Sequence, residues 1–271
     1  MIPAASRRGG AAALLALGLF VASPARAADD LRSIPTPRGV TESFLLVRPS
    51  APPAAAVVLF AGGNGALNLR TGRLAGLGGN FLVRNRGRFA GHGLLVAVLD
   101  SPSDRPGGLD GFRTSAAHAE DVGALIAALR AEGAPSVWLI GTSMGTVSAA
   151  SVAARLAGGG GPDGLVLTSS VTRPGRDRGE TVGDVRLKDI RVPTLVVHHR
   201  DDACRSTPYA DTPGLLRDLA ATPRHELLSF AGGDPPQSGP CDARAAHGYW
   251  GLDPEVVAAI AKWILDTPRR P

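Results

Sequence analysis

The sequence predicts an α/β protein with one domain built on a doubly wound, mostly parallel sheet. The first observation is a series of short, continuous apolar runs, typical of strands that are buried on both faces. These runs lie at 55–60, 94–99, 137–140, 165–169 and 194–198. The second observation is apolar residues at helical spacing between the runs, as at Val122, Leu125, Ile126 and Leu129. Strands that alternate with helices form a sheet covered on both faces.

The N-terminal residues have the features of a secretory signal peptide. Arg7 and Arg8 precede an apolar run over 11–22, and Ala25-Arg26-Ala27 is a small-x-small cleavage site. The run is too short to span a bilayer as a helix. We therefore expect residues 1–27 to be removed on export and residues 28–271 to form the domain, periplasmic or secreted and without stable membrane insertion. Both the general secretory route and the twin-arginine route stay open.

The charge balance argues against nucleic-acid binding. The chain has 29 basic and 24 acidic residues, and three of the arginines fall in the signal peptide, which leaves 26 against 24. A balance near zero with scattered arginines is not the footprint of a nucleic-acid-binding protein. Phosphate-loop, dinucleotide and His-Glu-x-x-His metal motifs are absent from the sequence, so we expect no cofactor and no metal.

The chain on either side of the apolar runs can be interpreted in order. Residues 28–40 look irregular, and the residue pattern at 41–47 predicts a first strand. The buried strand at 55–60 ends in a glycine-rich loop at 61–65. Ser115 is an N-cap candidate for the helix that carries Val122.

Further along, 226–230 predicts the last strand, and Asp253 and Pro254 predict the cap and first residue of a final helix.

The main functional signal is Gly141-Thr142-Ser143-Met144-Gly145, which follows an apolar run and precedes an Ala/Val-rich segment. This is the context of a serine nucleophile on a tight turn from strand to helix. Gly141 and Gly145 leave room for the turn, and the helix N-terminus supplies amides suited to a developing oxyanion. The sequence therefore predicts that Ser143 is a catalytic nucleophile.

A serine nucleophile needs a base, and the base needs an orienting carboxylate. His247 is the favoured base because it lies in a polar loop between the last strand and the last helix. His225 opens the last strand and is interpreted as structural. His198 and His199 end an apolar strand, so at least one of them is expected in the core or at the rim of the sheet. The acid is expected after the strand at 194–198, which leaves Asp201 and Asp202.

The oxyanion site needs two N–H donors. One is the amide of Met144, directly after the nucleophile. The other is expected from the glycine loop, at Gly63 or Asn64.

On these motifs the sequence resembles the α/β-hydrolase superfamily of serine hydrolases, over about residues 41–268. The resemblance implies the α/β-hydrolase fold and a triad of Ser143, Asp202 and His247, because the second of two acids in this segment is the catalytic one in many members. The sequence departs from the family at the oxyanion loop, where Ala61-Gly62 stands in place of the frequent His-Gly. The short polar interval before Thr194 also predicts that no large lid is present.

The resulting hypothesis is an exported carboxylic-ester hydrolase that acts on a small-molecule acyl substrate. Thioesterase, peptidase and acyltransferase chemistry stay open, as does a non-catalytic binding protein on the same fold. Oligomeric state is left open. Cys204 and Cys241, an even pair in an exported chain, predict a disulfide that joins the acid and histidine loops.

Overall fold

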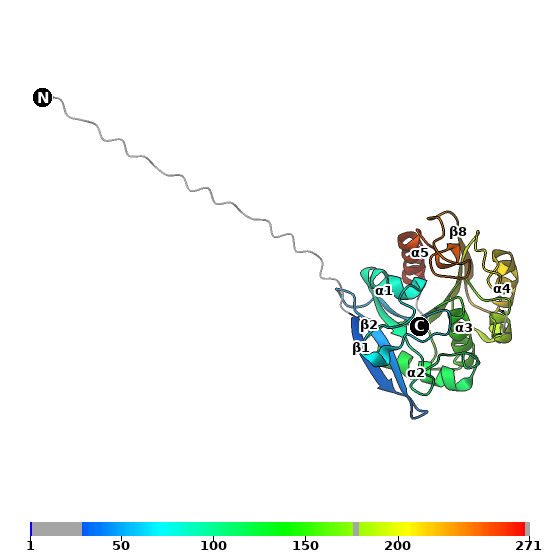
Figure 1. Ribbon diagram of the computed structural model, residues 1–271. Coiled ribbons are helices and arrows are strands. Elements are labelled where there is room, and N and C mark those ends of the chain that lie inside the picture. The colour runs from blue at the N-terminus through cyan, green and yellow to red at the C-terminus, as the bar shows by residue number, and fades with distance from the viewer. Residues whose placement is uncertain (2–28, 176–178, 269–271) are drawn as a thin grey trace.

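The computed structural model describes Met1, residues 29–175 and residues 179–268 (Figure 1). Residues 2–27 of the predicted signal peptide lie outside the described residues. An eight-stranded sheet with the order β1-β2-β4-β3-β5-β6-β7-β8 forms the centre of the domain, and β2 alone runs opposite to the other strands. The strands are β1 (Asp29–Pro35), β2 (Thr41–Val47), β3 (Ala55–Phe60), β4 (Leu94–Leu99), β5 (Val137–Thr142), β6 (Gly164–Thr168), β7 (Thr194–His199) and β8 (His225–Phe230).

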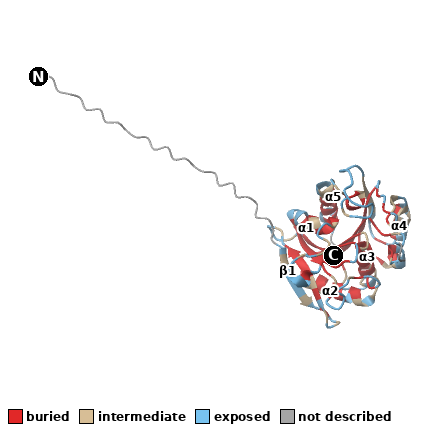
Figure 2. Ribbon diagram, viewed as in Figure 1, coloured by how far each residue is buried: buried red, intermediate tan, exposed pale blue. Residues whose placement is uncertain are grey.

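Helices cover both faces of this sheet, which explains why its central strands are apolar throughout (Figure 2). In β3, Val57 faces the core beneath α1 and α5, and the next residue, Val58, faces the core beneath α2 and α3. Alternate side chains of one strand thus enter two separate cores. The helices are α1 (Phe81–Gly91), α2 (Ala116–Ala131), α3 (Gly145–Arg155), α4 (Thr212–Asp218) and α5 (Asp253–Asp266).

The predicted fold class, a single α/β domain with a mostly parallel sheet, is confirmed. The predicted cap is confirmed too, because the Ser115 hydroxyl accepts a hydrogen bond of 3.0 Å from the amide of His118.

Two local predictions were wrong. Residues 28–40 were expected to be irregular, but 29–35 form β1, which pairs with β2 along seven residues. This edge strand is mostly exposed and lacks the apolar run of a buried strand.

Asp253 is also not the cap of the last helix, since Leu252 occupies that position. The carboxylate of Asp253 instead forms an ion pair of 2.7 Å with Arg84 on α1.

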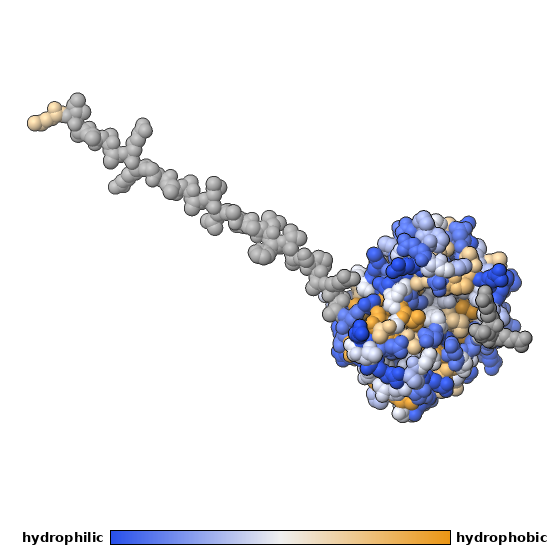
Figure 3. Space-filling view, viewed as in Figure 1, coloured by the Kyte–Doolittle hydropathy of each residue, from blue (hydrophilic) through white to orange (hydrophobic). Residues whose placement is uncertain are grey.

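No helix in the described ranges has the length and apolar character needed to cross a bilayer. Hydrophilic side chains cover much of the face shown in Figure 3, and apolar areas interrupt them.

Candidate active site

Ser143 lies on a strained turn between β5 and α3, at the carboxyl end of the central strand. Its φ of 52° is in the left-handed region that residues other than glycine rarely adopt. A Cβ atom at Gly145 would collide with the carbonyl of Phe60, and one at Gly141 would collide with the carbonyl of Gly145. The two glycines therefore let β5, the turn and α3 approach closely enough to form the turn. The Ser143 side chain remains partly exposed.

Asp202 and His247 meet in a buried contact beside the ends of β7 and β8. The carboxylate Oδ2 of Asp202 accepts a hydrogen bond of 3.0 Å from Nδ1 of His247. The residues are only 8% and 5% exposed. A carboxylate can only accept, so Nδ1 carries a proton, which makes Nε2 the acceptor in the neutral form of the ring. This is the tautomer that a general base for a serine hydroxyl needs.

Further donors surround the same carboxylate. Oδ1 of Asp202 accepts from the amide of Cys204 at 2.9 Å, and Oδ2 accepts from the hydroxyl of Thr207 at 2.8 Å. Nε2 of His198 lies 3.5 Å from Oδ2. Burial alone would raise the pKa of Asp202, but the nearby imidazoles of His198 and His247 and the Cys204 amide hold that pKa well below its usual range. Asp202 is therefore ionised at neutral pH.

The remaining candidates from the sequence lie elsewhere. The Asp201 side chain is 73% exposed, so the structure brings Asp202 and not Asp201 to His247. Nε2 of His198 donates to the carbonyl of Thr207 at 2.8 Å, and Nε2 of His199 is 3.0 Å from the carbonyl of Gly232. His225 is exposed at the start of β8.

The loop that carries His247 is attached to the domain at several points. Cys204 and Cys241 form the predicted disulfide, with 4.6 Å between their Cα atoms. The Ser169 hydroxyl donates to the carbonyl of His247 at 2.8 Å. Arg84 of α1 donates to the carbonyl of Gly248 at 2.6 Å. These contacts fix the position of the histidine from three sides.

Thr207, Ser169 and Arg84 were missed by the sequence analysis. Each is a single polar residue in an unremarkable stretch, and its role depends on a contact with a distant segment. A sequence pattern contains no signal for such contacts.

Ser143 and His247 are both hydrogen-bonded to the segment at the end of β6. The Ser143 amide donates to the carbonyl of Thr168 at 3.0 Å, and the next residue, Ser169, holds the backbone of His247. Both residues are in the described part of the chain, where no hydrogen bond joins the serine hydroxyl to the imidazole. Such bonds are often long without substrate and shorten when it binds.

The glycine loop after β3 lies against Ser143. A Cβ atom built on Gly62 would be 3.0 Å from the Cβ of Ser143. Gly63 has a φ of 57°, which suits glycine, and both Gly63 and Asn64 are exposed. Within the described residues, the amides of Met144, Gly63 and Asn64 have no hydrogen-bond acceptor. They are therefore free to donate to a ligand.

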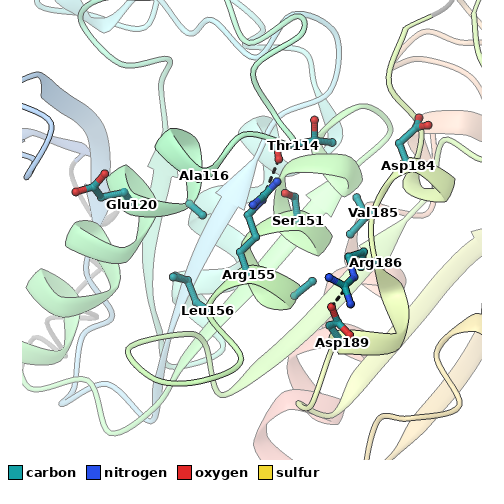
Figure 4. Close-up of a pocket in the computed structure, with 12 residues that line it drawn as sticks. Thr114, Ala116, Glu120, Ser151, Arg155, Leu156, Asp184, Val185, Arg186 and Asp189 are labelled. Carbon is teal, nitrogen blue, oxygen red and sulfur yellow. Dashed lines mark hydrogen bonds and ion pairs between the residues drawn. The ribbon is translucent and has the colours of Figure 1, made fainter.

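A pocket of about 710 Å³ lies on the other side of α3, between α2 and residues 184–189 (Figure 4). Arg155 donates from Nε to the carbonyl of Thr114 at its edge, and Arg186 pairs with Asp189. None of Ser143, Asp202 and His247 lines this pocket. It is therefore separate from the candidate active site.

The interval between β6 and β7 is the place where many lipases carry a helical lid. Its described residues, 169–175 and 179–193, contain two short 3₁₀ helices, Val182–Asp184 and Leu187–Asp189, and no α-helix. A helical lid is thus absent from the described part of this interval.

Comparison with known proteins supports the fold. No family model matches the sequence, and a search of curated proteins returns no significant match. Among solved structures, an α/β serine hydrolase without a lid from Xanthomonas campestris has a TM-score of 0.57 at 16% identity, over 89% of this chain and 97% of that one.

Two solved esterases are similar to the same extent. The esterase domain of a Rhodothermus marinus protein has a TM-score of 0.58 at 16% identity, over 88% of this chain and 98% of that one. An esterase from Pyrococcus furiosus has a TM-score of 0.58 at 13% identity, over 88% and 92%. The chain has the α/β-hydrolase fold.

Proposed function

We propose that this protein is an exported serine hydrolase that cleaves carboxylic esters of small molecules through an acyl-enzyme on Ser143. The observation that carries the proposal is the buried 3.0 Å hydrogen bond between His247 and an ionised Asp202, on the same sheet edge as a serine with left-handed backbone geometry. A non-catalytic protein on this fold has no need for the strained serine or for a buried carboxylate that orients a histidine.

In this mechanism, His247 takes the Ser143 proton at Nε2 while Oγ attacks the carbonyl carbon of the ester. Asp202 stabilises the imidazolium that forms. The amide of Met144 and an amide of the Gly63–Asn64 segment donate to the oxyanion. His247 then passes its proton to the alcohol oxygen as the C–O bond breaks. Water then gives a proton to His247 and attacks the acyl carbon. The bond from that carbon to Ser143 Oγ breaks, Oγ takes the proton back from His247, and the carboxylic acid leaves.

Two observations support an ester substrate of small size. No helical lid is present in the described part of the interval where lipases carry one, and the exposed Gly63 and Asn64 leave the site open. Two of the similar solved structures are described as esterases. Their sequence identities to this chain, 16% and 13%, show a shared fold only.

Export is proposed from two independent features. Residues 1–27 have the composition of a signal peptide. The disulfide between Cys204 and Cys241 is of a kind that persists in oxidising compartments. N-terminal sequencing of the protein recovered from the periplasm or medium tests this part, and an N-terminus at Met1 would contradict it.

A fluorophosphonate probe tests the hydrolase, because only an activated serine is labelled. We expect labelling of the wild type and none of Ser143→Ala. An unlabelled wild type would favour the non-catalytic alternative. Turnover of p-nitrophenyl esters of increasing chain length, measured beside thioester and peptide substrates, then separates esterase from thioesterase and peptidase chemistry. An ester preference for short acyl chains is expected.

A further inference from the structure

Arg113 is a fully buried arginine behind the glycine loop, and the proposed mechanism does not use it. It lies in the turn before α2 and is 0% exposed. Nη2 donates to the carbonyl of Gly63 at 2.7 Å, and Nη1 donates to the hydroxyl of Ser148 on α3 at 3.0 Å. The guanidinium therefore lies between the glycine loop and the helix that begins after the nucleophile.

The charge of Arg113 has no direct counterion in the described part of the chain. Its two hydrogen bonds go to a carbonyl and a hydroxyl, and its Nε has no partner there. Asp110 and Glu180 act only through longer-range attraction, and Glu180 is engaged with Thr114. Burial lowers the pKa of Arg113 to about 10, so the side chain is still charged at neutral pH. A buried charge without a partner is costly and rare away from functional sites.

The contact with Gly63 has a geometric consequence for the loop. In a planar trans peptide the C=O and the following N–H point in opposite directions. Because Arg113 holds the carbonyl of Gly63, the amide of Asn64 points away from the guanidinium. Further contacts fix the same loop, since the carbonyl of Asn64 accepts from the amide of Leu109 at 2.8 Å and its side chain donates to the carbonyl of Gly107.

We propose that Arg113 is a positioning residue for the oxyanion site, because it orients the peptide between Gly63 and Asn64. It also supplies a positive charge, which the negative charge of the tetrahedral oxyanion balances when it forms. This inference rests on the proposed function of Ser143. The negative charge develops on the way to the transition state, so Arg113 stabilises the transition state more than the bound ester. Loss of its charge should lower kcat and leave KM nearly unchanged.

The test compares Arg113→Met and Arg113→Gln with the control Arg155→Met. Arg155 also donates to a backbone carbonyl, that of Thr114, but it lines the separate pocket in Figure 4. The measurements are kcat and KM for p-nitrophenyl acetate, the inhibition constant of phenylboronic acid, and the melting temperature. Phenylboronic acid is suitable because its boron becomes a tetrahedral anion when a serine oxygen adds to it.

We expect kcat to fall about 10- to 100-fold in Arg113→Met, with the boronate bound more weakly and KM within about twofold of the wild type. Arg155→Met should behave as the wild type. Arg113→Gln removes the charge but keeps a hydrogen-bond donor. If Arg113→Met does not fold, the same measurements on Arg113→Gln test the proposal.

Wild-type kcat and boronate affinity in a folded, uncharged variant would overturn the proposal. A wild type that neither binds the boronate nor reacts with a fluorophosphonate would instead overturn the proposed function, so the two failures are distinguishable.

Discussion

The turn that carries Ser143 and the loop that carries His247 hold their side chains by different means. The position of Ser143 depends on its neighbours in sequence. Gly141 and Gly145 lie two residues to either side of it, β5 precedes the turn and α3 follows it. His247 lies in a loop without strand or α-helix, and distant segments fix it through Ser169, Arg84 and the Cys204–Cys241 bridge. The first arrangement is local and steric, and the second is distributed over the whole domain.

This difference implies that the two regions respond differently to substitution. A change at the turn acts on the chemistry or on the close approach of β5 and α3. A change at one support of the histidine loop leaves the other supports in place. Single variants on the histidine side should therefore have graded effects, whereas those at the turn should be all-or-none.

The largest effect is expected for Ser143→Ala. It removes the proposed nucleophile but keeps the glycines of the turn, so esterase turnover should fall by about 10⁴-fold or more while the melting temperature stays near that of the wild type. Turnover of p-nitrophenyl acetate and circular dichroism melting check both parts. Retained turnover in this variant would disprove the assignment of Ser143.

The next effect separates the two adjacent acids. Asp202→Asn should lower kcat by about 10³- to 10⁴-fold, because the amide no longer fixes the proton on Nδ1 of His247. Asp201→Asn is the matched control and should have kcat close to that of the wild type, because its side chain faces solvent. Equal losses in the two variants, or a larger loss at Asp201, would show that the carboxylate contact is not the orienting one.

The disulfide tests how far the histidine loop depends on a single support. Cys204→Ser with Cys241→Ser opens a crosslink between residues 37 apart, which should cost about 4 kcal/mol of unfolding free energy in the loop-entropy model. Turnover should fall as well, because the amide of Cys204 donates to Asp202. Urea unfolding and kcat measure the two effects. A stability loss with unchanged kcat would make the bridge purely structural.

The smallest effect concerns pH. The pKa of Asp202 is lower in the folded state than in the unfolded chain, so its ionised form stabilises the fold above the unfolded value of about 4. This contribution is lost as the pH falls further. The wild type should therefore exceed Asp202→Asn in unfolding free energy at pH 7, and the difference should shrink between about pH 4 and pH 2. Urea titrations across this range check it, and a difference that grows toward low pH would have the wrong sign.

The same comparison explains what the sequence could predict. The turn around Ser143 and the central strands follow from short stretches of residues, and the structure has them as expected. The preference for Asp202 came from resemblance, since Asp201 and Asp202 differ only in which one the fold buries. Strand β1 was missed because its residues pair with β2 but bury little apolar surface. Thr207 and Arg113 were missed because burial and long-range contacts alone give them significance.

The order of the site residues along the chain has a consequence for biosynthesis. Ser143 and its turn are complete long before the ribosome reaches β8, the loop with Cys241 and the segment with His247. The parallel sheet pairs strands that are distant in sequence, and such contacts form late. A nascent chain that has emerged only as far as Thr207 contains Ser143 and Asp202 but not His247, the proposed base. The hydrolase that we propose would thus be inactive during most of its synthesis.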